Sequence, residues 1–240
     1  MNRYSRGIGL IEMMVAMTLG LIVVLGVTQI FLSAKNTYQS QNSAAGMQED
    51  ARFVVSKMIQ EIRMVGMFGC LATVTDSSRQ ADFSAAFEKP ITVTRASDGS
   101  VVLTLVTADV GLSGAAPTWN IVSDCLFNAT AFSPADTPAV TAGQIIFPVR
   151  RLVYTYRNRQ ILVGPAANNQ AALVDNVSAF NVSFGVARSA SDETASSYED
   201  TPANPALIRT IRLVIELSDP KGLARAQTFN VVASVRNRLL

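Results

Sequence analysis

The chain opens with a long apolar run that holds a single charged side chain. Residues 8–34 are uncharged except for Glu12, and this run exceeds the roughly 20 residues that an α-helix needs to cross a hydrocarbon core. A carboxylate in such a segment costs about 2.5 kcal/mol or more unless it is paired, protonated or close to the headgroups. The pattern predicts a membrane-length helix whose one charge either lies at the interface or has a partner.

A second hydrophobic pattern follows further along the same helix. Apolar positions recur every three or four residues, as on one face of an amphipathic helix; they are Ala51, Val54, Val55, Met58, Ile62 and Val65. We expect one helix from about residue 10 to residue 67, about 85 Å long at the usual helical rise, ended by Gly66 and Gly69. Its first half suits a membrane or a filament, and its second half suits packing on a soluble domain.

Beyond residue 90 the pattern changes to the alternation that is typical of strands. In residues 209–217 the apolar side chains of Ile211, Leu213, Ile215 and Leu217 alternate with other positions, which predicts a half-buried strand. Further strand-rich stretches lie at residues 91–96, 101–108, 144–164, 175–187 and 226–238. Turn-forming residues separate the first two stretches at positions 97–99, and a hairpin is expected to turn near positions 157–159.

The predicted fold class is α+β. A long N-terminal α-helix, with a membrane half and an amphipathic half, packs on a mainly antiparallel β-sheet domain, and one sheet face is buried against the second half of the helix. Residues 71–89 are expected to be irregular. Residues 111–143, which contain several Pro, Ser and Asn residues, are expected to form a long connection.

Charge gives little reason to expect a nucleic-acid partner. The net charge of the 240-residue chain is +2, and no basic cluster forms an electrostatic footprint for a phosphate backbone. The densest positive stretch is Arg150, Arg151, Arg157 and Arg159, which lies on expected strands and a turn without a clear aromatic stacking platform. A solvated strand face is the favoured interpretation.

The chain has no histidine, which excludes Ser-His-Asp and Cys-His nucleophiles and any His-coordinated metal. It also lacks a glycine-rich phosphate loop, and we expect no cofactor and no metal. Four acids, Asp192, Glu193, Glu199 and Asp200, lie in a Ser- and Pro-rich segment that predicts an exposed loop. A calcium loop is the alternative there, but the spacing does not match a known ligand template.

The flanks of the apolar run indicate topology and redox compartment. A cleaved secretory signal peptide fits poorly because the run is too long, and two positive charges before it place the N-terminus in the cytoplasm and the body outside. Cys70 and Cys125 then lie in an oxidising compartment, where a pair favours a disulfide. Closing this loop contributes on the order of 4 kcal/mol in the chain-entropy model. Two buried free thiols are the alternative.

The stretch GIGLIEMMVAM at residues 7–17 resembles the signal of type IV pilins and type II secretion pseudopilins. The resemblance implies that a prepilin peptidase cuts between Gly7 and Ile8 and that the new N-terminus is methylated. It also implies that Glu12 pairs with the free amine of a neighbouring subunit, so that two buried charges neutralise each other during docking. Ile8 replaces the usual Phe, Gly9 replaces a common Thr, and the helix lacks the Pro of many major pilins.

With this resemblance the chain divides into four parts. They are a cleaved leader at residues 1–7, a transmembrane or filament-core helix at 8–34, its amphipathic continuation at 35–69 and a β-rich globular domain at 70–240.

Later stretches resemble one branch of the family. The segments MVGMFGC, YTYRNRQILV, LVDNVSAFNVSFG and SVRNR are similar to PilW-type minor pilins and to the related J-type pseudopilins. This resemblance implies a non-enzymatic subunit that joins other minor pilins, the major pilin and a tip adhesin. The inner-membrane assembly platform would draw it out of the bilayer, with its domain in the periplasm, and place it at the pilus tip on the cell surface.

Three alternatives remain open. A J-type secretion pseudopilin shares nearly every feature. A pilin specialised for DNA uptake would use the arginines at 150, 151, 157 and 159, and its DNA affinity would depend on salt. A membrane-anchored periplasmic enzyme would need a pocket with converging acids, and the missing histidine argues against it.

Overall fold

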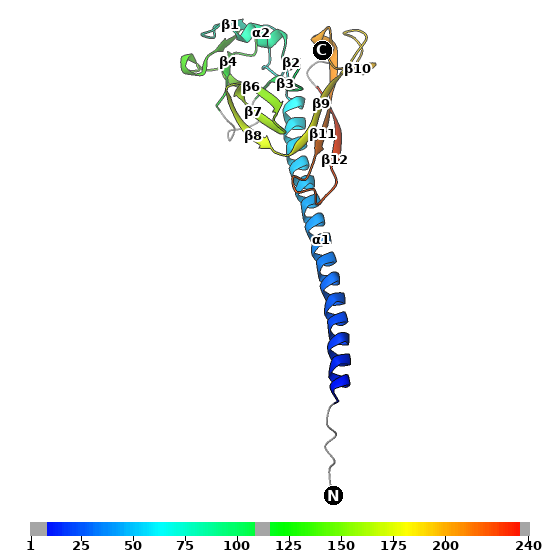
Figure 1. Cartoon of the computed structure of the whole chain (residues 1–240). Helices are drawn as coiled ribbons and strands as arrows, with labels where there is room; N and C mark the ends of the chain where they lie inside the picture. The colour runs from blue at the N-terminus through cyan, green and yellow to red at the C-terminus, as the bar shows by residue number, and fades with distance from the viewer. Residues whose placement is uncertain (1–8, 109–115, 236–240) are drawn as a thin grey trace.

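The computed structural model describes residues 9–108 and 116–235 and has an α+β layout (Figure 1). Helix α1 (Leu10–Arg63) carries the domain at its C-terminal end. The other elements are β1 (Thr75–Asp76), α2 (Phe83–Glu88), β2 (Ile91–Arg95), β3 (Val101–Ala108), β4 (Trp119–Ser123), β5 (Ala129–Phe132), η1 (Pro134–Asp136), β6 (Ile145–Arg157), β7 (Gln160–Ala166), β8 (Asn169–Val174), β9 (Val177–Val186), β10 (Ser197–Glu199), η2 (Pro205–Leu207), β11 (Ile208–Leu217) and β12 (Gln227–Ser234).

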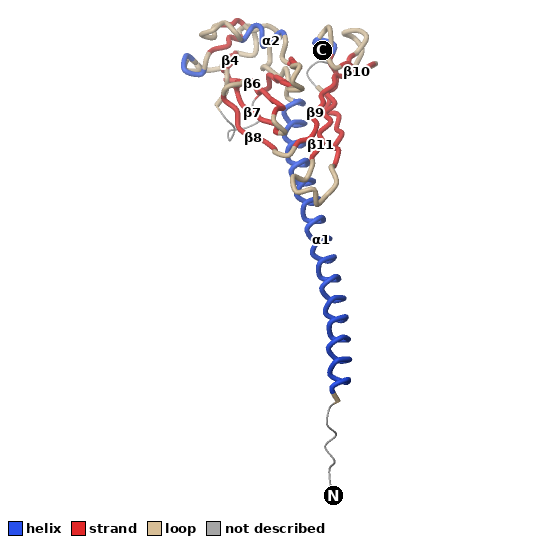
Figure 2. Tube along the Cα trace, viewed as in Figure 1, coloured by secondary structure: helices blue, strands red, loops and turns tan. Residues whose placement is uncertain are grey.

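Within the described residues the strands form two sheets (Figure 2). The larger has the order β1-β5-β4-β6-β3-β2, and β7 pairs with β6 and β8. Strand β6 is its centre, because β3 pairs along one side while β4 and β7 pair with its first and second parts. The smaller sheet has the order β10-β9-β11-β12. All pairs are antiparallel except the parallel pair of β1 and β5.

The C-terminal half of α1 lies between the two sheets and shares one apolar core with both (Figure 1). The buried helix residues are Met47, Ala51, Val54, Met58 and Ile62. The alternation predicted for residues 209–217 is confirmed, because Ile211, Leu213, Ile215 and Leu217 are all buried. The predicted α+β layout is confirmed, but where one sheet face was expected against the helix, faces of two sheets pack on it. Between β8 and β9 the chain turns through Asn176, whose φ is +60°, and starts a second sheet.

The helix ends at Arg63, earlier than the predicted residue 67. The chain beyond it pairs with the last residues of β3 in the larger sheet: Val65 forms a bridge with Thr107, and the Gly66 N–H donates to the Val106 carbonyl at 3.2 Å. Gly66 has a φ of +78°, which favours glycine. The helix therefore ends where pairing with the sheet begins, although the apolar periodicity continues to Val65.

The expected connection over residues 111–143 is also corrected by the structure. Its described part contains strands β4 and β5, which pair with each other, and β4 pairs with β6. Trp119 and Ile121 are buried in a second apolar cluster with Phe83 of α2. The stretch at residues 71–89, expected to be irregular, contains β1 and α2. These elements are short, and their pairing with distant strands is not visible in local sequence.

Two predicted turns are confirmed. The β2–β3 hairpin turns at Gly99, with a φ of +82°, and the β6–β7 hairpin turns at Asn158 and Arg159, with φ of +50° and +60°. Two consecutive left-handed residues are typical of the tight hairpin turn that matches strand twist.

Candidate functional site

The N-terminal half of α1 projects from the domain and is exposed along its whole length (Figure 1). Every residue from 9 to 38 is exposed, including large apolar side chains such as Leu10, Ile22 and Phe31. In the part of the chain that the structure describes, α1 is the one helix long and apolar enough to cross a membrane. Water is a poor solvent for such a surface, so this half needs lipid or other apolar helices around it.

Glu12 lies in the first turn of α1, and its side chain is exposed. Gly9, which precedes the helix, has no side chain that could cap it. A carboxylate at this end interacts favourably with the helix dipole. Gly7 and Ile8 lie outside the described residues, so the predicted cleavage and the pairing of Glu12 with a neighbouring subunit's amine stay predictions.

Three threonines of the exposed half of α1 hydrogen-bond within the helix. Thr18, Thr28 and Thr37 each donate to a backbone carbonyl three or four residues earlier, at 2.9, 2.8 and 3.0 Å. Such bonds remove the cost of leaving a hydroxyl unpaired in an apolar medium. Sequence reasoning missed these three residues, although Thr within an apolar helix is a signal that could have identified them.

Two glycines interrupt the apolar surface of this half without interrupting the helix. Gly20 and Gly26 have open space where a side chain would project. Small residues allow another helix to approach closely in an apolar environment. The surface around them is therefore suited to packing against other helices.

The other half of α1 is attached to the larger sheet through a polar contact inside the domain. Lys57 Nζ lies 2.6 Å from Glu61 Oε1, and the Tyr154 hydroxyl of β6 donates to Glu61 Oε2. Burial, and then the charge of Glu61, raises the pKa of Tyr154 far above its usual value of 10.0, so the phenol stays protonated. The helix is thus held to β6 by a charge-assisted hydrogen bond.

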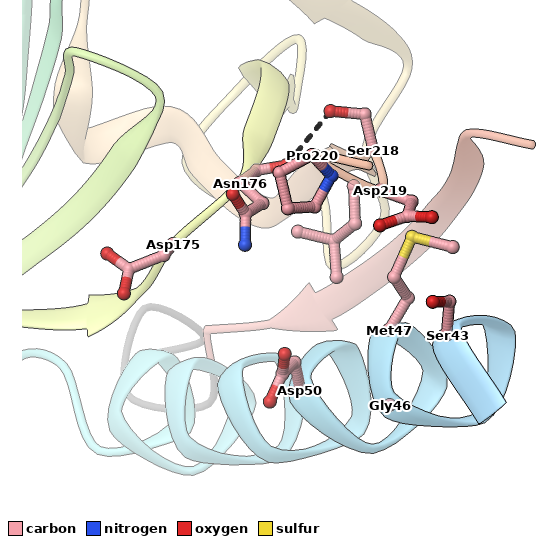
Figure 3. Close-up of a pocket in the computed structure, with 10 residues that line it drawn as sticks. Ser43, Gly46, Met47, Asp50, Asp175, Asn176, Ser218, Asp219 and Pro220 are labelled. Carbon is pink, nitrogen blue, oxygen red and sulfur yellow. Dashed lines mark hydrogen bonds between the residues drawn. The ribbon is translucent and has the colours of Figure 1, made fainter. Parts of the chain in front are cut away.

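The same half of α1 meets the smaller sheet at a small pocket of about 150 Å³ (Figure 3). Ser43 and Asp50 of α1 lie on one side of it, and Asn176 and Asp219 lie on the loops opposite. The backbone N–H of Lys221, with further bonds from the same loop and from Ser43, lowers the pKa of Asp219. In residues 9–108 and 116–235 no three acidic or cysteine side chains are grouped to hold a metal. The contacts here tie the helix to the β11–β12 loop.

The structure joins Cys70 to Cys125, with a Cα–Cα distance of 5.3 Å. Cys70 follows the end of α1, and Cys125 lies on the loop between β4 and β5. The bond connects the chain beyond the helix to the cluster that Trp119 and Phe83 form.

The four arginines do not form one free basic face. Arg151 is paired with Asp82 at 2.9 Å and lies 4.7 Å over the Trp119 ring, and Arg159 donates to Ser218. Arg157 and Arg159 are exposed, whereas Arg150 and Arg151 are partly buried. The solvated strand face predicted for them is therefore correct only for the two residues at the turn.

The acidic segment is exposed at Glu193, Glu199 and Asp200, as predicted, and a short part of it forms a strand. Ser197–Glu199 forms β10, which pairs with β9. Arg209, 3% exposed, donates to the backbone carbonyls of Ala190 and Asp192 at 2.9 Å each. A buried arginine that bonds carbonyls of a distant loop has no local sequence signal.

Comparison with known proteins identifies one motif. Residues 2–28 match the family described as the prokaryotic N-terminal methylation motif. No curated protein matches the chain. The motif is a type IV pilin-like prepilin signal. Together with the exposed half of α1, which carries most of it, it fits a membrane-anchored protein with a structural role.

Proposed function

We propose that this protein is a minor pilin of the PilW type. It joins other minor pilins in the inner membrane, primes assembly of a type IV pilus and is incorporated at the tip of the fibre. The observation that carries the proposal is the methylation motif at residues 2–28 on a helix whose first half is entirely exposed while one face of its second half is buried against the domain.

In this proposal each half of α1 has its own task. The prepilin peptidase removes residues 1–7, and the exposed half moves from lipid into a bundle of other subunits' helices without loss of apolar contact. Glu12 then pairs with the amine of a neighbouring subunit, because a charge in that bundle is costly unless it is neutralised. The domain contacts other minor pilins, the major pilin and a tip adhesin.

The test is mass spectrometry of sheared surface fibres and of membranes. We expect a mature peptide that begins at methylated Ile8 in both fractions, at a small fraction of the major subunit in the fibres. Retention of Met1 would contradict the proposal. A processed chain that stays in membranes, together with a secretion defect, would instead favour the J-type pseudopilin.

A pair of variants tests the role of the carboxylate. Glu12→Gln removes the charge. We expect the amount of this chain in sheared fibres to fall at least about tenfold, which corresponds to about 1.4 kcal/mol. The amount in membranes should stay unchanged. Glu49→Gln is the matched control, since Glu49 is an exposed acid on the same helix. Equal incorporation of both variants would exclude subunit docking through Glu12.

A further inference from the structure

Two large apolar side chains are mostly exposed on the β4–β5 loop. Leu126 is 71% exposed and Phe127 is 85% exposed. Apolar side chains exposed together on a folded domain mark a candidate contact surface.

The loop that carries them is held in one conformation. The Asp124 carboxylate accepts the backbone N–H groups of Leu126, Phe127 and Asn128 at 2.9, 2.8 and 2.8 Å. The Asn128 side chain adds a fourth bond at 3.0 Å, and Cys125 is fixed by the disulfide. A contact loop that is already ordered loses little conformational entropy when it binds.

The apolar surface extends to the adjacent strand. Ile145, at the start of β6, is 52% exposed and lies opposite Ser123 in the β4–β6 ladder. Ser123 in turn accepts the backbone N–H of Cys125 at 3.0 Å. The loop therefore starts next to Ser123, which lies opposite a strand end that is also apolar and exposed.

The position of the loop excludes the membrane as its partner. Cys70, which holds the loop, lies seven residues beyond the end of α1 at Arg63, and seven residues reach at most about 25 Å. If the first 20 or so residues of α1 span the bilayer, roughly 50 Å of helix separates that span from Arg63. The loop follows β4, which lies at the end of the domain away from the exposed half of α1 (Figure 1), so its partner is a protein and not the membrane.

We propose that Leu126 and Phe127 insert into an apolar groove on another subunit of the same assembly, on the side away from the membrane. This proposal rests on the proposed function, because it identifies the surface through which the domain contacts a neighbouring subunit. An aromatic and an aliphatic side chain on a rigid loop act as an anchor, while surrounding contacts complete the interface.

The test uses the full-length chain in the cells that produce it. The double variant Leu126→Ser with Phe127→Ser is compared with Val232→Ser, a control at a 49% exposed apolar residue of β12. We expect the double variant to be processed and to reach membranes normally but to fall at least about tenfold in sheared fibres. The control is expected to match the unsubstituted chain. Equal incorporation of both would overturn the proposal.

A photo-crosslinking residue in place of Phe127 identifies the partner in fibres and in membranes. We expect a crosslink to a different chain that carries an N-terminal methylation motif, and its loss when Leu126 is changed to Ser. Crosslinks only to lipid, only to a second copy or to no chain would overturn the proposal. If the unsubstituted chain is absent from fibres, the proposed function fails. The crosslink in membranes then still shows whether the β4–β5 loop contacts another subunit.

Discussion

Single residues of the domain hold charged groups that would otherwise be costly to bury. The side chain of Glu61 is 15% exposed and is shared between Lys57 on the same helix and Tyr154 on β6. A partly buried carboxylate is stabilised only while hydrogen bonds satisfy it. The polar contact between α1 and the larger sheet therefore depends on the hydroxyl of Tyr154.

Replacing Tyr154 with Phe should lower the free energy of unfolding by about 1.5–3 kcal/mol, because a hydrogen bond to a charged group is lost. Tyr156→Phe is the matched control. Its hydroxyl donates to the neutral Ser178 carbonyl at 3.1 Å, so the expected loss is about 0.5–1.5 kcal/mol. Guanidinium unfolding of the full chain in detergent measures both. Equal losses of unfolding free energy would show that the charge of Glu61 does not strengthen the hydrogen bond from Tyr154.

At the scale of elements, α1 is one helix with two environments. Its C-terminal half is buried on one face only, since Met58 is fully buried while Phe53 is 59% exposed. Helical periodicity predicted this face, and the structure adds that the face meets two sheets.

Met58→Ala should destabilise the domain by about 2–5 kcal/mol, because it leaves a cavity between the helix and both sheets. Phe53→Ala, on the exposed face, should change stability by less than about 0.5 kcal/mol. Fluorescence of Trp119, the one tryptophan of the chain, is a suitable signal because its side chain is 1% exposed. A small effect at Met58 would contradict the packing described for α1.

Replacing glycine with alanine should change stability in opposite directions at a strand position and at a helix position. A Cβ at Gly164 of β7 would lie 1.8 Å from the Asn169 carbonyl oxygen, so Gly164→Ala should cost about 1–3 kcal/mol by forcing the β7–β8 hairpin apart. Gly46 of α1 has open space around it, and Gly46→Ala should stabilise by about 0.5–1 kcal/mol. Thermal unfolding of both variants is the measurement, and a neutral Gly164→Ala would contradict the close approach.

At the scale of the whole molecule, one covalent bond links the end of α1 to the β4–β5 loop. Cys70 and Cys125 are 55 residues apart in the chain. The disulfide thus joins the second apolar cluster, built by β4 and α2, to the segment that leaves the helix.

Changing both cysteines to Ser should lower stability by about 4 kcal/mol, since the unfolded chain regains the entropy of a loop of this length. Reduction of the unsubstituted protein with a thiol should give the same loss, and adding thiol to the double variant should change nothing further. Unfolding midpoints with and without thiol measure this. A double variant as stable as the original would indicate compensating structure in the unfolded chain.

Much of this architecture could be predicted from local patterns. The helix, the strands with turns at Gly99 and Asn158, and the disulfide follow from periodicity, turn residues and cysteine count. The elements that were missed, α2, β1, β4, β5, β8 and β10, are all short, and a short element carries little periodic signal. Of the candidate site, Glu12 has a local signal, whereas Tyr154 at Glu61 and Arg209 under the acidic loop have none.

The sequence by itself determined that an apolar, motif-bearing helix precedes a β-rich domain, because each of those features is local and periodic. Only the tertiary structure decided that the helix lies between two sheets and stops at Arg63, where the chain beyond it pairs with β3. It also decided that Leu126 and Phe127 face solvent. Burial and long-range pairing are properties of the packed chain, and a stretch of sequence does not carry them.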